Sequence, residues 1–330
     1  MTTRRFDVTA IGNAIVDVIA QAEDALLAQH NLPKGAMNLI DADTAEKLYA
    51  IMGPGKEASG GSAGNTVAGI AALGGKTAYI GKVASDQLGE VFTHDIRAVG
   101  VTYDTMPLVG GLPTARSLIF VTPDAQRTMQ TFLGATTQLG PEDVNMDYIT
   151  SSKVLYLEGY LWDQPRAKKA MRDAAITAQQ AGVKVSLTLS DSFCVARFRD
   201  EFLELAEKHV DILFANEGEI LSLYQTDNFD TALQQVRKHC EIAALTRSEK
   251  GSVVVNGSEV HIIDAVKGVK VVDTTGAGDA YAAGFLYAYT QGRDLATCGK
   301  LGGAMAAKVI SHFGPRSEVT DVKKIAASVL

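Results

Sequence analysis

The sequence DTTGAGD, residues 273–279, follows the strand-like pair Val271-Val272 and runs directly into a helix-like stretch of small residues. Gly276, Ala277 and Gly278 carry almost no side chain, so their backbone N–H groups can approach an anion closely at the start of a helix. The helix dipole adds to this attraction because its positive end lies at the N-terminus. The segment therefore predicts an anion hole where a strand gives way to a helix.

Asp279 closes this segment three residues after Gly276, on the same face of the first helical turn. A carboxylate beside bound phosphate is repelled by it, so the position needs a purpose, and accepting the proton of an attacking hydroxyl is such a purpose. The alternative is a glycine-rich turn in which Asp279 only interacts favourably with the helix N-terminus. For an isolated GxGD pattern the two interpretations carry equal weight.

On the N-terminal side of this segment, strand-like and helical patterns alternate. Apolar runs typical of buried strands occupy residues 6–12, 77–83, 153–157, 183–189, 211–214 and 242–246. Apolar residues at helical spacing occupy residues 63–73, 166–181, 201–209 and 231–239. The alternation predicts an α/β fold with a parallel sheet and helices on both faces.

Two stretches interrupt the alternation, at about residues 14–41 and 103–133. In them Gly and Pro, rather than helices, separate strand-like pieces such as residues 115–122 and 128–132. Because the two stretches are similar in character, we predict that they pair as one small β lid on a single domain of residues 1–330.

Composition and charge indicate a globular protein and argue against nucleic-acid and membrane partners. Of the 330 residues, 46% are hydrophobic and 21% charged, which suits a globular chain with a large core. The net charge is −7 and no basic run occurs, so we expect no nucleic-acid partner. The longest apolar stretch, near residues 280–289, is too short to span a bilayer, and the three scattered cysteines indicate reduced thiols. We expect a cytoplasmic protein without a membrane partner.

The full string DTTGAGD resembles the C-terminal signature, DTxGAGD, of the ribokinase-like sugar and nucleoside kinases, also called the PfkB family. A second family signature is recognisable in GGSAGN, residues 60–65, continuing to residues 74–77 and 81–89. The resemblance spans nearly the whole chain. It implies a ribokinase-like three-layer sandwich with a mainly parallel central sheet, and transfer of a phosphoryl group from ATP to an alcohol.

The resemblance also implies catalytic roles. Asp279 is similar to the family's catalytic base, and Gly276, Ala277 and Gly278 to its anion hole, with Gly278 also touching the nucleotide. Arg127 resembles a lid arginine that approaches the path of the phosphate. The alternative for Arg127 is a solvated surface charge in a hairpin.

Acceptor-binding positions are implied near the N-terminus. Asn13 and Asp17, in GNAIVD, and Gly61 and Asn65 match family positions that touch the sugar. A carboxylate or amide can bind vicinal hydroxyls, and glycine lets a sugar ring approach the backbone. The alternatives are that Asn13 and Asp17 form turns and that Asn65 caps a helix.

Two further segments resemble nucleotide-binding motifs. Asn216 and Glu219 match the NxxE motif, which helps to place Mg²⁺, largely through water, and a carboxylate suits that ion. The same spacing is typical of a capping box, and both roles are compatible. Residues Thr246 to Gly251 resemble the loop TxGxxG, but Ser248 stands where a glycine is usual.

Family members often bind a monovalent cation beside the anion hole, and Asp273 and Thr275 are the matching residues. The cofactors implied by the resemblance are therefore ATP, Mg²⁺ and, at this position, K⁺. The lid strands could pair between subunits or stay capped, so both a monomer and a homodimer remain open.

The spacing Gly12-Asn13-x-x-x-Asp17 is similar to that of adenosine kinases and favours phosphorylation of a nucleoside 5′-hydroxyl, adenosine to AMP. Tyr160 and Trp162 are candidates for a wall of the adenine pocket, or else they seal the lid against the core. One alternative function is a kinase for a free sugar such as ribose or fructose. Another is an inactive ligand-binding protein on the same fold, against which the intact Asp279 argues.

Overall fold

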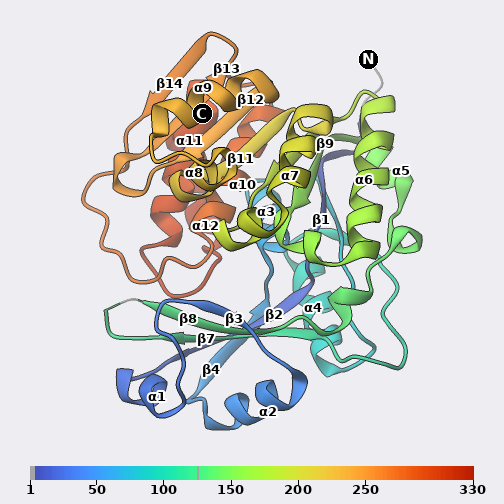
Figure 1. Cartoon of the computed structure of the whole chain (residues 1–330), viewed down its shortest axis with the longest axis vertical. Helices are drawn as coiled ribbons and strands as arrows, with labels where there is room; N and C mark the ends of the chain where they lie inside the picture. Colours follow the sequence, from blue (N-terminus) through green and yellow to red (C-terminus); the bar gives the residue numbers. More distant parts are fainter. Residues whose placement is uncertain (1–3, 125) are drawn as a thin grey trace.

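In the computed structural model, which describes residues 4–124 and 126–330, the apolar runs form a nine-stranded central sheet (Figure 1). Its strands, in spatial order, are β14 (Glu259–Ile263), β13 (Ser252–Asn256), β12 (Ile242–Thr246), β11 (Ile212–Asn216), β10 (Lys184–Thr188), β9 (Ser152–Glu158), β1 (Phe6–Ile11), β5 (Thr77–Ile80) and β6 (Thr102–Tyr103). The strands from β6 to β12 are parallel, whereas β13 and β14 form an antiparallel edge. Because this parallel sheet is covered on both faces, its strands are nearly continuous apolar runs.

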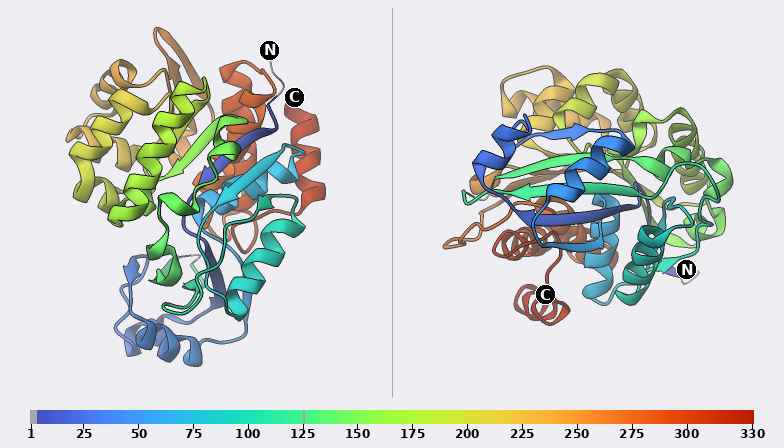
Figure 2. Two further views of the ribbon diagram at one scale, coloured as in Figure 1. Left: turned by 90° about the vertical axis from the view of Figure 1, so that its right-hand side faces the viewer. Right: turned by 90° about the horizontal axis from the view of Figure 1, so that it is seen from below.

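Helices cover both faces of the central sheet (Figure 2). One face carries α5 (Met146–Thr150), α6 (Pro165–Gln180), α7 (Ser192–His209), α8 (Glu217–Tyr224) and α9 (Phe229–His239). The other carries α3 (Ser62–Ala72), α4 (Gln87–Ala98), α10 (Ala277–Thr290), α11 (Leu295–Val309) and α12 (Val319–Val329). Short 3₁₀ turns occupy Gly134–Gln138, Pro141–Asp143, Gly159–Asp163 and Ser248–Lys250. The predicted three-layer α/β architecture is confirmed.

A second, five-stranded sheet lies beside the central domain, at the bottom of Figure 1. Its order is β3 (Met37–Leu39), β8 (Arg127–Phe132), β7 (Ala115–Val121), β2 (Ile15–Gln21) and β4 (Gly55–Ser59). Helices α1 (Asp24–Gln29) and α2 (Ala42–Ile51) cover its outer face, where Val18, Leu118 and Phe120 are buried. Alternate residues of the same strands, such as Asp17 and Ser117, face the opposite way.

The structure differs from the sequence prediction in three elements. Val271-Val272 is not a strand: Val271 is exposed and the Val272 N–H donates to the carbonyl of Ile310, beyond the C-terminus of α11. The seventh helix, α7, begins at Ser192, well before residue 201, because Asp191 caps it and a kink at Phe198 breaks its apolar periodicity. Strand β4 belongs to neither interrupting stretch, because its sequence GKEAS is a polar edge strand.

In the described part of the chain, every helix is too short or too polar to cross a lipid bilayer.

Candidate active site

A single long cavity of about 1110 Å³ runs between the carboxyl ends of the central strands and the inner face of the small sheet. In open α/β sheets, ligands bind at this edge, outside the carboxyl ends of the strands. The cavity is larger than a pocket for one drug-sized ligand needs, so it has room for two ligands end to end.

Most residues singled out in the sequence meet in this cavity. The residues that line it are Asn13, Asp17, Gly61, Asn65, Arg127, Tyr160, Asn216, Glu219, Thr246, Ser248, Gly251, Thr275, Gly276, Ala277, Gly278 and Asp279. They come from both sheets and from segments more than two hundred residues apart. The fold therefore places residues of separate sequence motifs in one cavity. Two predicted residues, Trp162 and Asp273, do not line it.

The loop before α10 has the form that the glycine-rich segment requires. Gly276 caps the helix with φ of 76°, a left-handed conformation that favours glycine, and a Cβ there would lie 2.7 Å from the Cβ of Pro315. The buried carboxylate of Asp273 accepts hydrogen bonds from the N–H and hydroxyl of Thr275, at 2.9 and 2.6 Å, and from the N–H of Gly314 at 2.9 Å. Asp273 therefore fixes the loop from behind while the N-terminus of α10 faces the cavity.

Asp279 lies in the first turn of α10 and is held by two donors from α3. The Ser62 hydroxyl donates to Oδ1 at 2.6 Å and Nδ2 of Asn65 donates to Oδ2 at 3.0 Å. Burial raises the pKa of Asp279, and these two hydrogen bonds, followed by the charges of Arg127 and Arg316, oppose the rise. The arrangement orients a carboxylate that is a stronger proton acceptor than an exposed aspartate.

The acceptor end of the cavity holds Asp17 on β2. Burial raises its pKa to about 7, against the attraction of Arg316. Gly60 leaves room for this carboxylate, because a Cβ there would lie 2.2 Å from Oδ2 of Asp17. Gly61 has φ of 82°, and a Cβ there would lie 2.1 Å from the carbonyl oxygen of Asn13. The glycine pair is thus required by the close approach of β2 and the chain before it.

Glu158, at the end of β9, is a site residue that the sequence analysis missed. Its Oε1 accepts hydrogen bonds from Nδ2 and N of Asn13, at 2.8 and 3.3 Å, and its Oε2 accepts one from the N–H of Ala63 at 2.8 Å. Burial raises its pKa to about 7. The sequence feature that could have identified Glu158 is a charged residue at the end of an apolar strand, because ligands bind at that edge of the sheet.

Asn216 and Glu219 form a complete capping box at the start of α8. Each side chain accepts a hydrogen bond from the backbone N–H of the other, both at 2.9 Å, and burial raises the pKa of Glu219 to about 7. Among the described residues, no three acidic, His or Cys side chains lie close enough to hold a metal ion by themselves. Mg²⁺ commonly binds through one or two carboxylates, water and substrate phosphates, and Glu219 at the cavity wall fits that mode.

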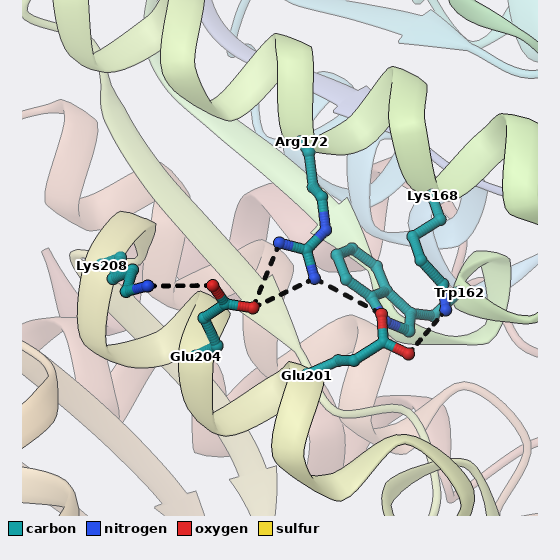
Figure 3. Close-up of polar contacts among 6 residues, drawn as sticks. All are labelled: Trp162, Lys168, Arg172, Glu201, Glu204 and Lys208. Atoms are coloured by element: carbon teal, nitrogen blue, oxygen red, sulfur yellow. Dashed lines mark hydrogen bonds and ion pairs between the residues drawn. The ribbon is translucent and has the colours of Figure 1, made fainter.

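Trp162 is buried and does not line the cavity, so its predicted place in an adenine pocket is wrong. Figure 3 shows its indole beside Glu201, Lys168 and Arg172. Its ring lies against Phe202 at a centroid distance of 5.6 Å, and its indole N–H donates to Glu201 at 3.2 Å. Lys168 and Arg172 of α6 complete this contact between α6 and α7. Trp162 therefore stabilises helix packing, whereas Tyr160 two residues earlier lines the cavity.

Comparison with known proteins shows which family the chain resembles. The profile described as pfkB family carbohydrate kinase matches residues 36–321. The solved adenosine kinase of Sinorhizobium meliloti is 57% identical, with a TM-score of 0.94, and the match covers 99% of this chain and 100% of that one. A probable sugar kinase from Rhizobium etli CFN 42 is 56% identical, with the same TM-score and coverage. A 5-dehydro-2-deoxygluconokinase from Halalkalibacterium halodurans is 29% identical over 341 residues, covering 99% of this chain and 96% of the relative.

The predicted family resemblance is thus confirmed along nearly the whole chain. The chain belongs to the pfkB family of carbohydrate kinases and is an ATP-dependent kinase.

Proposed function

We propose that the protein is an adenosine kinase, which transfers the γ-phosphoryl group of ATP to the 5′-hydroxyl of adenosine and yields AMP and ADP. The observation that carries this proposal is one continuous cavity that joins a polar acceptor end to the helix-start loop with Asp279 between them. The 57% identity to the adenosine kinase of Sinorhizobium meliloti supports the choice of acceptor.

The wall of the acceptor end favours a nucleoside over a free sugar. The inner face of the small sheet lines it with the apolar side chains of Ile15, Met37, Leu39, Ile119 and Met129. A flat apolar surface can pack against a purine, whereas a free sugar presents hydroxyls that such a surface leaves unpaired. Tyr160 lines the same cavity and adds an aromatic side chain.

In the proposed reaction, Asn13, Asp17, Gly61 and Asn65 bind the ribose, and Asp279 accepts the proton of the 5′-hydroxyl. The oxygen then forms a bond to the γ-phosphorus as the bond from that phosphorus to the bridging oxygen of ADP breaks. The N–H groups of the loop 276–278 and the guanidinium of Arg127 stabilise the charge on the transferring group.

The nucleotide end consists of Thr246, Ser248 and Gly251 after β12, with Asn216 and Glu219 beside them. Mg²⁺, when bound through Glu219 and water, neutralises charge on the ATP phosphates. We assign Asp273 and Thr275 to a K⁺ site, since Asp273 offers a buried carboxylate directly behind the loop.

We further propose that the small sheet is a lid. Its inner face covers the acceptor end, and closure would exclude water and prevent hydrolysis of ATP. Arg127 begins strand β8 of this sheet, so the same closure would bring its guanidinium to the phosphate path.

A second candidate is a kinase for a free sugar or sugar acid. It is favoured by the names of the relatives from Rhizobium etli and Halalkalibacterium halodurans. The same loop and the same base would serve it, and only the acceptor would differ.

The test measures ADP release from ATP and Mg²⁺ with adenosine, ribose, fructose, 5-dehydro-2-deoxygluconate or no acceptor. We expect kcat/KM for adenosine to exceed that for each other acceptor by about a hundredfold or more. A preference for a sugar would replace adenosine but keep the site. No turnover with any acceptor, despite binding of ATP, would support a catalytically inactive binding protein.

A further inference from the structure

Arg316 lies behind the cavity, in the segment between α11 and α12, and no sequence motif singles it out. Its Nε donates a hydrogen bond to Oδ1 of Asn65 at 2.9 Å, and its Nη1 donates to the hydroxyl of Ser59 at 2.7 Å. Both partners are buried, Ser59 completely. The guanidinium therefore joins the end of β4 to the first turn of α3.

The contact with Asn65 determines which way that amide faces. Arginine has only donors, so the oxygen of the amide must face Arg316 and its NH₂ group must face the other way. On that other side, Nδ2 of Asn65 donates to Oδ2 of Asp279 at 3.0 Å. An amide turned by 180° would instead place its oxygen against the carboxylate, where two acceptors repel each other. Arg316 thus selects the orientation in which Asn65 serves Asp279.

The backbone next to Arg316 is attached to the anion-hole loop. The N–H of Gly314 donates to Oδ2 of Asp273 at 2.9 Å, and Pro315 lies against Gly276. The position of Arg316 is therefore fixed to the same loop that precedes Asp279. Arg127, the other arginine near the base, is carried by the small sheet instead.

The charge of Arg316 is not neutralised by a direct partner. Among the residues that the structure describes, acidic groups act on it only through their charge and not through a direct hydrogen bond, and its Nη2 is buried without a hydrogen-bond partner. Three carboxylates nevertheless lie around it, Asp17, Asp95 and Asp279, and their attraction opposes the lowering of its pKa by burial. A fixed positive charge of this kind favours the ionised form of each nearby carboxylate.

We infer that Arg316 is a positioning residue for phosphoryl transfer, which holds the Asn65 amide so that it donates to Asp279. The inference rests on the proposed role of Asp279 as the base. Arg316 does not line the cavity and is not assigned a contact with either substrate.

A pH profile can separate this role from a purely structural one. Burial raises the pKa of Asp279 and Arg316 opposes the rise, so loss of Arg316 should move the acidic limb of kcat to higher pH. The other charged or titratable groups that face Asp279 are Asp17, Arg127, Tyr156, Glu158, Tyr160 and Glu219. Because Asp17 belongs to the acceptor end, we expect its protonation to change KM for adenosine. The pH dependence of kcat at saturating adenosine should then reflect mainly the protonation of Asp279.

The experiment compares Arg316→Met, Arg316→Lys and Asp279→Asn with the wild type, using adenosine, ATP and Mg²⁺ from pH 5.5 to 9. We expect Arg316→Met to lower kcat on the order of tenfold and to shift its acidic limb to higher pH. Arg316→Lys keeps the charge but loses the forked geometry, so its limb should stay in place while kcat falls. Arg97→Met is the matched control, because Arg97 donates to the carbonyl of Tyr103 away from the cavity.

Three outcomes overturn the inference. First, the acidic limb of Arg316→Met could coincide with that of the wild type while Asp279→Asn is inactive. This outcome would exclude the positioning role of Arg316 but keep Asp279 as the proposed base. Near-normal turnover of Asp279→Asn removes the base itself, and the inference fails with it. If Arg316→Met does not fold, as judged by circular dichroism, Arg316→Lys decides, and an unchanged kcat in that variant overturns the role.

Discussion

At the scale of single residues, Asp279 carries the chemistry of the proposed reaction because two donors from α3 aim its carboxylate into the cavity. Asp279→Asn keeps the shape of the side chain but removes the proton acceptor. We expect kcat to fall by about 10²- to 10⁴-fold, while dissociation constants of ATP and adenosine, measured by calorimetry, stay within a few fold. Asp227→Asn, at an exposed position between α8 and α9, is the control and should be silent. Turnover near the wild-type rate would exclude Asp279 as the base.

Site residues could be predicted from the sequence where the local backbone restricts the residue type. This holds for the loop 273–279 and for the glycines at 60 and 61, where backbone conformation and close approach of other atoms limit each position. Arg316 contacts Asn65 across 251 residues of sequence, so nothing in its neighbourhood marks it. Trp162 was misplaced because an aromatic residue after a strand can face either the cavity or the core, and only packing against Phe202 decides between them.

At the scale of elements, the start of α8 tests whether Asn216 does more than cap a helix. Asn216→Ser keeps a capping side chain, so we expect little change in thermal stability but a raised KM for Mg·ATP, since the amide beside Glu219 is lost. Asn228 is the matched cap of α9, outside the cavity, and accepts a hydrogen bond from the N–H of Thr231. Asn228→Ala should cost about 1 kcal/mol of stability and leave KM unchanged. An unaltered KM in Asn216→Ser would reduce Asn216 to a cap.

The elements themselves were predictable to different degrees. Central strands such as β12 could be predicted closely because burial on both faces requires a continuous apolar run. Strand β4 was missed because only its pairing with β2 makes the polar sequence GKEAS extended. Helix α7 was found only in its second part, since the kink at Phe198 shifts the apolar face between its two segments.

At the scale of the whole molecule, the cavity confines three acids whose pKa burial raises to about 7, Asp17, Glu158 and Glu219. A carboxyl with a raised pKa in the folded state binds its proton more tightly there than in the unfolded chain. Its contribution therefore reduces the free energy of unfolding as pH rises from about 4 to about 7, and is constant above that range. The site is thus maintained at a cost in stability near neutral pH.

Asp17→Asn measures this cost, because among the described residues only burial and nearby charges, and no hydrogen bond to its carboxylate, set the pKa of Asp17. We expect the variant to gain stability relative to the wild type as pH rises, by on the order of 2–3 kcal/mol between pH 5 and 8 in urea unfolding. Its KM for adenosine should rise at the same time. Asp43→Asn, on the exposed side of α2, should show a pH-independent difference from the wild type. A flat difference for Asp17→Asn as well would mean that Asp17 is ionised in the folded state.

Two short connections between the small sheet and the central domain have a mechanical consequence. Residues 12–14 join β1 to β2, and residues 60–61 join β4 to α3, so a swing of the small sheet would bend the chain at these two hinges. Both hinges carry proposed acceptor contacts, Asn13 in the first and Gly61 in the second. An acceptor bound there would restrict the motion of both hinges. Binding of the acceptor and movement of the small sheet would therefore be coupled.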